Sequence, residues 1–224
     1  MSVHALLAHL EAAGFGGAPR PLGLDAEGRD VVTFLAGETV GTARPWPSWT
    51  HSDEALADVA DWLRRYHAAV ADFVPPGSSY WREGGEWRPG LIIAHNDAAP
   101  YNAVWNSGGL VGFVDWDMAG PITRELDVAW VAFSWIPLHA AHVVAAEGFT
   151  ELASRPRRLS LFLREYGWSG TTQDILELIA TRLSRQLTVM SDNAAAGDST
   201  YQAMIEVGRR HDLQVALDQL ESFS

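Results

Sequence analysis

The chain has 224 residues, enough for one ordinary domain or two small lobes that share a core. Its 47% hydrophobic and 20% charged residues are typical of a globular protein. It has no cysteine, which excludes disulfides and cysteine-based metal sites, and all 16 basic residues are arginine, which excludes chemistry that needs a lysine. The formal net charge of −12 disfavours nucleic acid and anionic membranes as partners.

The first elements predicted are a helix and a β-hairpin. Ser2 can cap a helix with an apolar face, and Gly14 stops it. Residues 20–24 and 30–36 are expected to form two strands, with the turn 25–28 between them. A segment rich in proline, glycine and tryptophan follows, and we expect it to be a linker.

A second amphipathic helix begins after Thr50 or Ser52 and ends before the Pro-Pro-Gly sequence at 75–77. Residues 77–90 are polar and glycine-rich and predict a loop. A short buried strand is expected at 91–94.

The rest of the chain predicts one more hairpin and then helices. Strands at 102–105 and 110–115 flank an Asn-Ser-Gly-Gly turn. From Leu126 onward the pattern is helical, and the uncharged run 128–146 contains a proline, which favours an interrupted buried helix over a membrane span. The clearest helices are expected at three places: 159–166, 172–190 and 201–220.

Polar residues gather around the second hairpin. His95, Asp97 and Asn102 follow the buried strand with the spacing H-x-D-x-x-x-x-N, and Asp115 ends the hairpin within Val-Asp-Trp-Asp. A hairpin with a short turn brings Asn102 and Asp115 to the same end, where an amide oxygen and a carboxylate suit Mg²⁺. A free carboxylate beside such a site can orient and deprotonate a hydroxyl that attacks a phosphate.

These two motifs resemble the catalytic loop and the D-F-G segment of protein kinases. With Asn96 in place of the arginine and Asp115-Trp-Asp117 in place of D-F-G, the chain resembles the aminoglycoside phosphotransferase and choline kinase-like family. Pro100 before Asn102, and Asp127-Val-Ala where that family has D-L-A, extend the resemblance.

The resemblance implies a role for each residue. Asp97 would be the catalytic base, and Asn102 and Asp115 would bind Mg²⁺. His95 and Asp127 would brace the catalytic loop. Asp117 would contact the substrate or its surroundings, and the backbone of Phe34, Leu35 and Ala36 would meet the adenine of ATP.

The resemblance also implies an α+β, protein kinase-like fold. It predicts a reduced N-terminal lobe of a helix and a hairpin at 1–37, a linker at 38–50, and a mainly helical C-terminal lobe at 51–224 that carries the small catalytic hairpin. The expected activity is ATP- and Mg²⁺-dependent transfer of the γ-phosphate to a hydroxyl of a polar or cationic small molecule. Without a recognisable signal peptide or membrane span, the expected location is the cytoplasm.

One departure from the family opens an alternative. Members carry a hairpin and a third strand before the first helix, and a lysine there grips the phosphates. In this chain the helix begins at Ser2, and there is no lysine. A catalytically impaired binding protein is therefore an alternative, and a metal-dependent hydrolase is a third. An isolated hairpin leaves open edges, so we also expect a homodimer through the N-terminal hairpin.

A purely structural role remains an alternative for several of these residues. Asp97, Asn102 and Asp115 could serve turn formation alone, since Asp and Asn favour turns. His95 could be an ordinary buried histidine, and Asp127 could cap a helix that begins near Val128.

Overall fold

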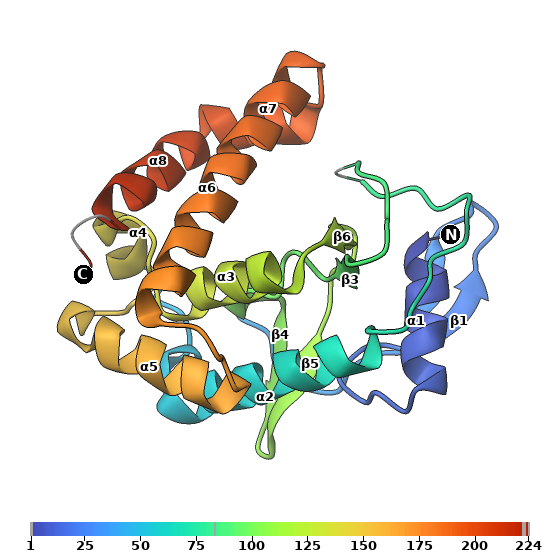
Figure 1. The fold of residues 1–224 in the computed structure, drawn as a ribbon, viewed down its shortest axis with the longest axis horizontal. Coiled ribbons are helices and arrows are strands. Elements are labelled where there is room, and N and C mark those ends of the chain that lie inside the picture. Colours follow the sequence, from blue (N-terminus) through green and yellow to red (C-terminus); the bar gives the residue numbers. More distant parts are fainter. Residues whose placement is uncertain (1, 83, 221–222, 224) are drawn as a thin grey trace.

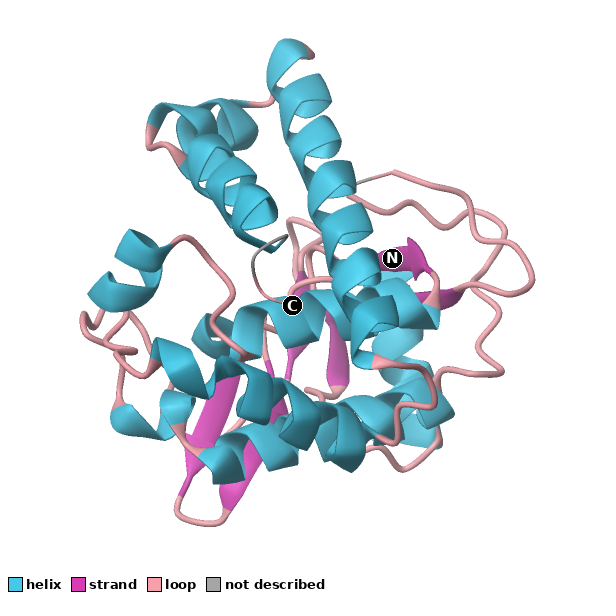
Figure 2. Cartoon of the chain, turned by 60° about the vertical axis from the view of Figure 1, so that its left-hand side comes forward, coloured by secondary structure: helices cyan, strands magenta, loops and turns pink. Residues whose placement is uncertain are grey.

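The computed structural model describes residues 2–82, 84–220 and 223. It is a mainly helical molecule with three small antiparallel two-stranded sheets (Figures 1 and 2). The helices are α1 (Ser2–Ala12), α2 (Asp53–Ala69), α3 (Arg124–Trp135), α4 (Ala141–Ala146), α5 (Arg155–Tyr166), α6 (Thr172–Ala195), α7 (Ser199–Glu206) and α8 (Arg209–Leu220), with single 3₁₀ turns η1 (Ser48–His51), η2 (Pro100–Asn102) and η3 (Leu152–Ser154). The strands are β1 (Pro21–Leu24), β2 (Asp30–Val32), β3 (Ile92–Ala94), β4 (Ala103–Asn106), β5 (Gly109–Phe113) and β6 (Gly120–Ile122). The predicted α+β class is confirmed.

The N-terminal part consists of α1 and the β1–β2 hairpin, which lie at one side of the molecule (Figure 1). Leu6, Leu7 and Leu10 bury one face of α1, as their spacing predicts. The second strand is shorter than predicted and ends at Val32 instead of reaching residue 36. The hairpin pairs with no further strand among the described residues, so nothing extends the ladder beyond that point.

Aromatic packing fixes the β4–β5 hairpin against α2. Ser52 caps α2 by accepting a hydrogen bond from the Ala55 N–H at 3.0 Å. The ring of Trp62 stacks on Tyr66 with centroids 5.1 Å apart and lies 4.5 Å from Phe113 of β5. These fully buried rings anchor the hairpin that carries the polar motif.

One strand was not predicted. Residues 120–122 form β6, which pairs antiparallel with β3. A Gly-Pro-Ile sequence has little intrinsic strand propensity, and only the tertiary partner makes it a strand.

The helical half departs from the prediction at four places, of which the first is α5, which begins at Arg155, four residues earlier than expected. Helix α3 begins at Arg124, and the Thr123 side chain accepts its capping hydrogen bond, so Asp127 lies inside the first turn and is not the cap. Helix α6 continues to Ala195, five residues further than expected. The helix predicted at 201–220 is two helices, α7 and α8, because Gly208 between them has φ +85°.

Helices α6, α7 and α8 form an elongated layer that projects from the rest of the molecule (Figure 1). Across the described ranges, every helix falls short of the length and apolarity needed to cross a membrane.

Candidate active site

A left-handed turn places the predicted base at the end of β3. Asn96 has φ +62°, and its side-chain amide donates to the carbonyls of Met118 at 3.1 Å and Gly120 at 3.4 Å. Asn tolerates this conformation better than most residues, because its short polar side chain can hydrogen-bond locally. The turn ends the buried strand and carries the chain into the loop that begins at Asp97.

His95 ties that loop to the second motif. Its Nε2 lies 3.1 Å from the Val114 carbonyl oxygen, and the Asp97 N–H donates to its Nδ1 at 3.3 Å. A carbonyl can only accept and an N–H can only donate, so the imidazole carries its proton on Nε2. Complete burial lowers the pKa of His95 to about 4, which keeps the ring neutral at physiological pH.

Two side-chain donors orient the Asp97 carboxylate. The Tyr101 hydroxyl donates to one oxygen at 2.7 Å, and Asn102 Nδ2 donates to the other at 2.8 Å. The same Nδ2 also donates to the Asp97 backbone carbonyl at 2.9 Å. A carboxylate has about four acceptor positions, and these two bonds use one position on each oxygen.

Asn102 and Asp115 meet at the end of the β4–β5 hairpin, as predicted. The Val114 N–H donates to the Asn102 carbonyl at 3.0 Å, which places the next residue, Asp115, beside Asn102. Asp115 is exposed and adopts φ +61°, an unusual conformation for a non-glycine residue.

The residues at this end of the hairpin fit a hard cation such as Mg²⁺. Both N–H bonds of the Asn102 amide are directed to Asp97, so its Oδ1 oxygen is the part left for another partner. Together with the Asp115 carboxylate this is an oxygen-only donor set. Within the described ranges, His, Cys, Asp and Glu side chains form no cluster of three or more that could hold a metal. An ion at this position would therefore depend on Asn102, Asp115 and oxygens from a bound ligand.

Asp127 lies deeper, in a buried chain of polar groups. It is 1% exposed, and its Oδ2 is 2.9 Å from Nε2 of His67 in α2. The other nitrogen of His67 is 2.9 Å from the Tyr166 hydroxyl of α5. The chain joins α3, α2 and α5, whereas His95 contacts the catalytic loop itself.

The remaining predicted residues lie nearer the surface. Asp117 is exposed in the turn after Trp116. Phe34 is 86% exposed, and residues 34–36 follow β2 without regular structure. The linker joins the site directly after them: the backbones of Glu38 and Trp105 exchange hydrogen bonds of 2.7 and 2.8 Å.

That junction requires a glycine. A Cβ on Gly37 would lie 2.6 Å from the Trp105 carbonyl oxygen. The close approach brings segment 34–36 next to the catalytic hairpin.

Sequence reasoning missed Tyr101 as a site residue. Its position four residues after Asp97, inside the catalytic loop, was the available signal, but the pattern H-x-D-x-x-x-x-N leaves that position unspecified.

Comparison with known proteins supports the family inferred from the motifs. Residues 79–162, which contain both motifs, match the sequence model of the phosphotransferase enzyme family. The whole chain is similar in structure to an amicoumacin kinase in complex with AMP-PNP and Ca²⁺, with a TM-score of 0.60 and 11% identity over 99% of this chain and 77% of that one. It is also similar to a spectinomycin phosphotransferase in complex with ADP and spectinomycin, with a TM-score of 0.56 and 12% identity over 98% and 82% of the two chains. The fold is therefore that of the aminoglycoside phosphotransferases, and the predicted resemblance to this protein kinase-like family is confirmed.

A curated relative is more similar in sequence. It is a trifolitoxin immunity protein of Rhizobium leguminosarum bv. trifolii, 36% identical over 173 residues, which make up 75% of this chain and 64% of that protein. The chain thus spans just under two thirds of the length of that relative.

Proposed function

We propose that the protein is an ATP- and Mg²⁺-dependent phosphotransferase that transfers the γ-phosphate to a hydroxyl group of a small molecule. The observation that carries the proposal is the hydrogen-bonded pair of Asp97 and Asn102, with Asp115 adjoining it across the hairpin. The match of residues 79–162 to the phosphotransferase family supports it.

In this mechanism Asp97 acts as the base. Tyr101 and Asn102 hold its carboxylate in one orientation, which allows it to accept the proton of the attacking hydroxyl. His95 fixes the loop backbone and stays neutral. Asn102 and Asp115 would hold Mg²⁺, which when bound neutralises charge on the phosphates. The backbone of Phe34, Leu35 and Ala36 would meet the adenine, and Asp117 would lie near the acceptor.

The second candidate is a binding protein that keeps the fold without efficient transfer. It is favoured by the absence of lysine from the chain, because a preorganised positive charge on the phosphates typically contributes about 10²–10³ in rate. The relative is named for immunity to a toxin. Immunity can arise by sequestering a toxin as well as by modifying it.

Calorimetric titration with Mg²⁺ and ATP separates the two. The phosphotransferase predicts Mg²⁺-dependent nucleotide binding that Asp115→Ala weakens and Asp192→Ala, an exposed aspartate of α6, leaves unchanged. Asp97→Ala should then keep nucleotide binding and lose phosphate transfer. Absence of Mg²⁺-dependent nucleotide binding would reject the phosphotransferase in favour of the binding protein.

A further inference from the structure

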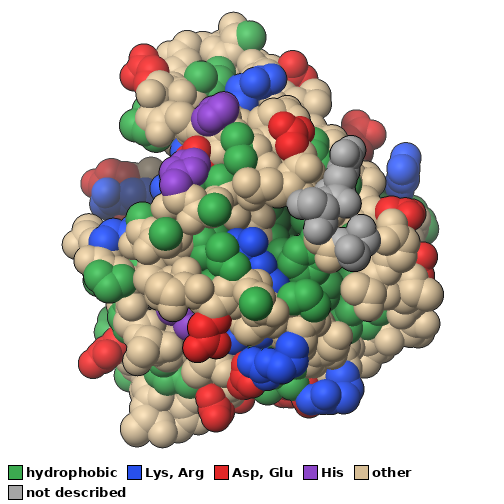
Figure 3. Space-filling model, turned by 90° about the vertical axis from the view of Figure 1, so that its left-hand side faces the viewer, with side chains coloured by type: hydrophobic (Ala, Val, Ile, Leu, Met, Phe, Trp, Pro, Cys, Tyr) green, Lys and Arg blue, Asp and Glu red, His purple; other side chains and the backbone are tan. Residues whose placement is uncertain are grey.

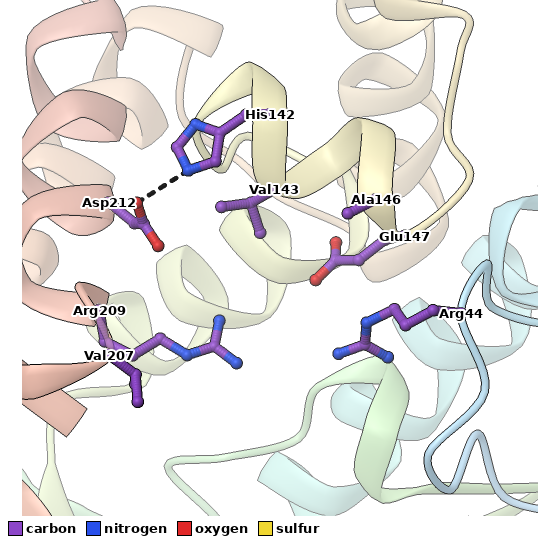
Figure 4. Close-up of a pocket in the computed structure, with 8 residues that line it drawn as sticks. All are labelled: Arg44, His142, Val143, Ala146, Glu147, Val207, Arg209 and Asp212. Atoms are coloured by element: carbon purple, nitrogen blue, oxygen red, sulfur yellow. Dashed lines mark hydrogen bonds and ion pairs between the residues drawn. The ribbon is translucent and has the colours of Figure 1, made fainter. Parts of the chain in front are cut away.

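A second feature lies beside the catalytic loop: a cavity of about 400 Å³ between the linker, α4 and the α7–α8 layer. Its lining residues come from segments far apart in sequence (Figure 4): Arg44, His142, Val143, Ala146, Glu147, Val207, Arg209 and Asp212. This volume is in the range of pockets that hold small molecules.

Two arginines approach the cavity from opposite sides. Arg44 belongs to the linker and Arg209 begins α8, and their guanidinium groups point toward one another (Figure 4). Arg44 lies over the ring of Trp46, 5.2 Å from its centroid, which helps to fix its position. Among the described residues, no carboxylate oxygen lies within 4 Å of either guanidinium, although salt bridges at that distance occur elsewhere in the chain.

The cavity also holds two acidic groups, which offset part of the charge of the two arginines. Asp212 is directed to His142, with 2.9 Å between its Oδ1 and the imidazole Nε2. Glu147 is 7% exposed, and its carboxyl points into the space between the two arginines (Figure 4). Burial raises the pKa of Glu147 to about 7, although Arg44 and Arg209 act in the opposite direction. A large fraction of Glu147 is therefore neutral near pH 7, and the cavity keeps a positive character.

The cavity adjoins the catalytic base through two aromatic side chains. The guanidinium of Arg44 lies over the ring of Trp46. That ring is 6.5 Å from the ring of Tyr101, and the Tyr101 hydroxyl donates to Asp97. The backbone N–H of Trp46 also donates to the Glu147 carbonyl at 2.9 Å, which ties the linker to the end of α4. The side chains of Trp46 and Tyr101 thus link the cavity to Asp97.

We infer that this cavity binds a carboxylate of the acceptor, held between Arg44 and Arg209, so that the substrate is a hydroxyl compound bearing a carboxylate. Paired guanidinium groups recognise planar anions through charge-assisted hydrogen bonds. An acceptor that carries only positive charge would bring no anionic group to pair with these two guanidinium groups. A cationic acceptor, as expected from the acidic composition, therefore fits only as a zwitterion. That the bound carboxylate belongs to the acceptor rests on the proposed phosphotransferase function. The binding of a carboxylate in the cavity does not depend on that function.

The test uses matched pairs of compounds on the full chain. Glycolate, L-malate, N-acetyl-L-serine and glycyl-L-serine are compared with their carboxamides by calorimetry without nucleotide. At least one carboxylate should bind about tenfold or more tightly than its amide, and Arg44→Gln and Arg209→Gln should each reduce that binding about tenfold to hundredfold. Arg185→Gln, which replaces an exposed arginine of α6 outside the cavity, should have no effect.

Three results would overturn the inference: binding of none of these carboxylates, equal binding of acids and amides, or carboxylate binding that both arginine variants retain. Transfer assays with Mg²⁺ and ATP separate the two proposals. Carboxylate binding that depends on both arginines, without phosphate transfer, keeps the cavity assignment and rejects the phosphotransferase. Transfer to neutral or cationic acceptors that both variants retain keeps the phosphotransferase and rejects the cavity assignment.

Discussion

At the scale of single residues, Glu147 should leave a measurable pH dependence on stability. Burial raises its pKa from the ordinary 4.5 to about 7, so the folded state binds this proton more tightly than the unfolded state does. The stabilisation is fully present below about pH 4.5 and is lost as the pH rises through about 7. The charged groups that act on the Glu147 carboxyl are Arg44 from the linker and Arg209 from α8, whereas His51 of η1 contacts only its backbone carbonyl.

Glu147→Gln removes that titration and keeps the size of the side chain. The free energy of unfolding of the wild type, relative to this variant, should fall by about 1–3 kcal/mol between pH 5 and pH 8. Urea unfolding of both proteins at several pH values measures the difference. Glu151→Gln is the control, because that glutamate is exposed and outside the cavity. Parallel pH profiles for wild type and Glu147→Gln would contradict the role assigned to burial.

Asn96 shows how one residue shapes the catalytic loop. Its positive φ and its hydrogen bonds to the carbonyls of Met118 and Gly120 connect the loop to β6. Asn96→Ala should lower stability by about 1–2 kcal/mol. It removes these two hydrogen bonds and the one that Arg182 donates to the Asn96 Oδ1 at 3.4 Å, and it places a less tolerant residue in a left-handed conformation. Thermal unfolding measures the loss, and Asn96→Gly should recover the backbone part of it. Equal stability of Asn96→Ala and wild type would refute the assignment.

At the scale of elements, three helices are joined by the buried chain of Asp127, His67 and Tyr166. The Tyr166 hydroxyl partners one nitrogen of a fully buried imidazole, and Asp127 partners the other. Tyr166→Phe leaves the His67 nitrogen without that partner, which should lower the free energy of unfolding by about 1–3 kcal/mol. Urea denaturation gives the value. Tyr80→Phe, at a side chain that is 80% exposed, should change it by less than about 0.5 kcal/mol. Similar losses for both variants would show that the buried hydrogen bond contributes nothing specific.

The elements also show which parts of the fold can be predicted from the sequence. The helix after Ser52 and the β4–β5 hairpin follow from caps, turns and apolar spacing, all of which are local signals. The strand β6 depends on β3, a partner some 28 residues away, so no local pattern indicates it. The start of α3 was placed too late because Thr123, the true cap, stands before charged residues instead of an apolar run.

The candidate site divides in the same way. The meeting of Asn102 and Asp115 follows from hairpin geometry, which the sequence encodes locally. The cavity brings together Arg44, Glu147 and Arg209, which lie more than 60 residues apart in sequence. Each of them is an ordinary charged residue in its own segment. Only the packing of the α7–α8 layer against the rest of the chain makes them neighbours, and no spacing rule predicts that contact.

At the scale of the whole molecule, the exposed β1–β2 hairpin bears on whether two copies of the chain associate. Four of its apolar side chains face solvent: Leu22, Leu24, Val31 and Val32 are 65%, 48%, 40% and 38% exposed. Phe34, two residues after β2, is 86% exposed. On the face drawn in Figure 3, acidic and basic side chains are interspersed with hydrophobic ones. Open strand edges with exposed apolar side chains favour pairing with another strand. We therefore predict a homodimer through β1 and β2.

Sedimentation at micromolar concentration tests the dimer. Val32→Lys places a charge on the β2 edge and should shift the wild-type dimer to monomer, since charged side chains on edge strands prevent pairing. Val74→Lys is the matched control, because Val74 is 65% exposed and outside the hairpin, and it should leave the dimer intact. A wild-type monomer, or dissociation by both lysine variants alike, would contradict pairing through this hairpin. If the dimer forms, segment 34–36 lies near the interface, because it begins two residues after β2 ends. Dimerisation should then change access to the backbone that is proposed to meet the adenine, and nucleotide affinity should differ between wild type and Val32→Lys.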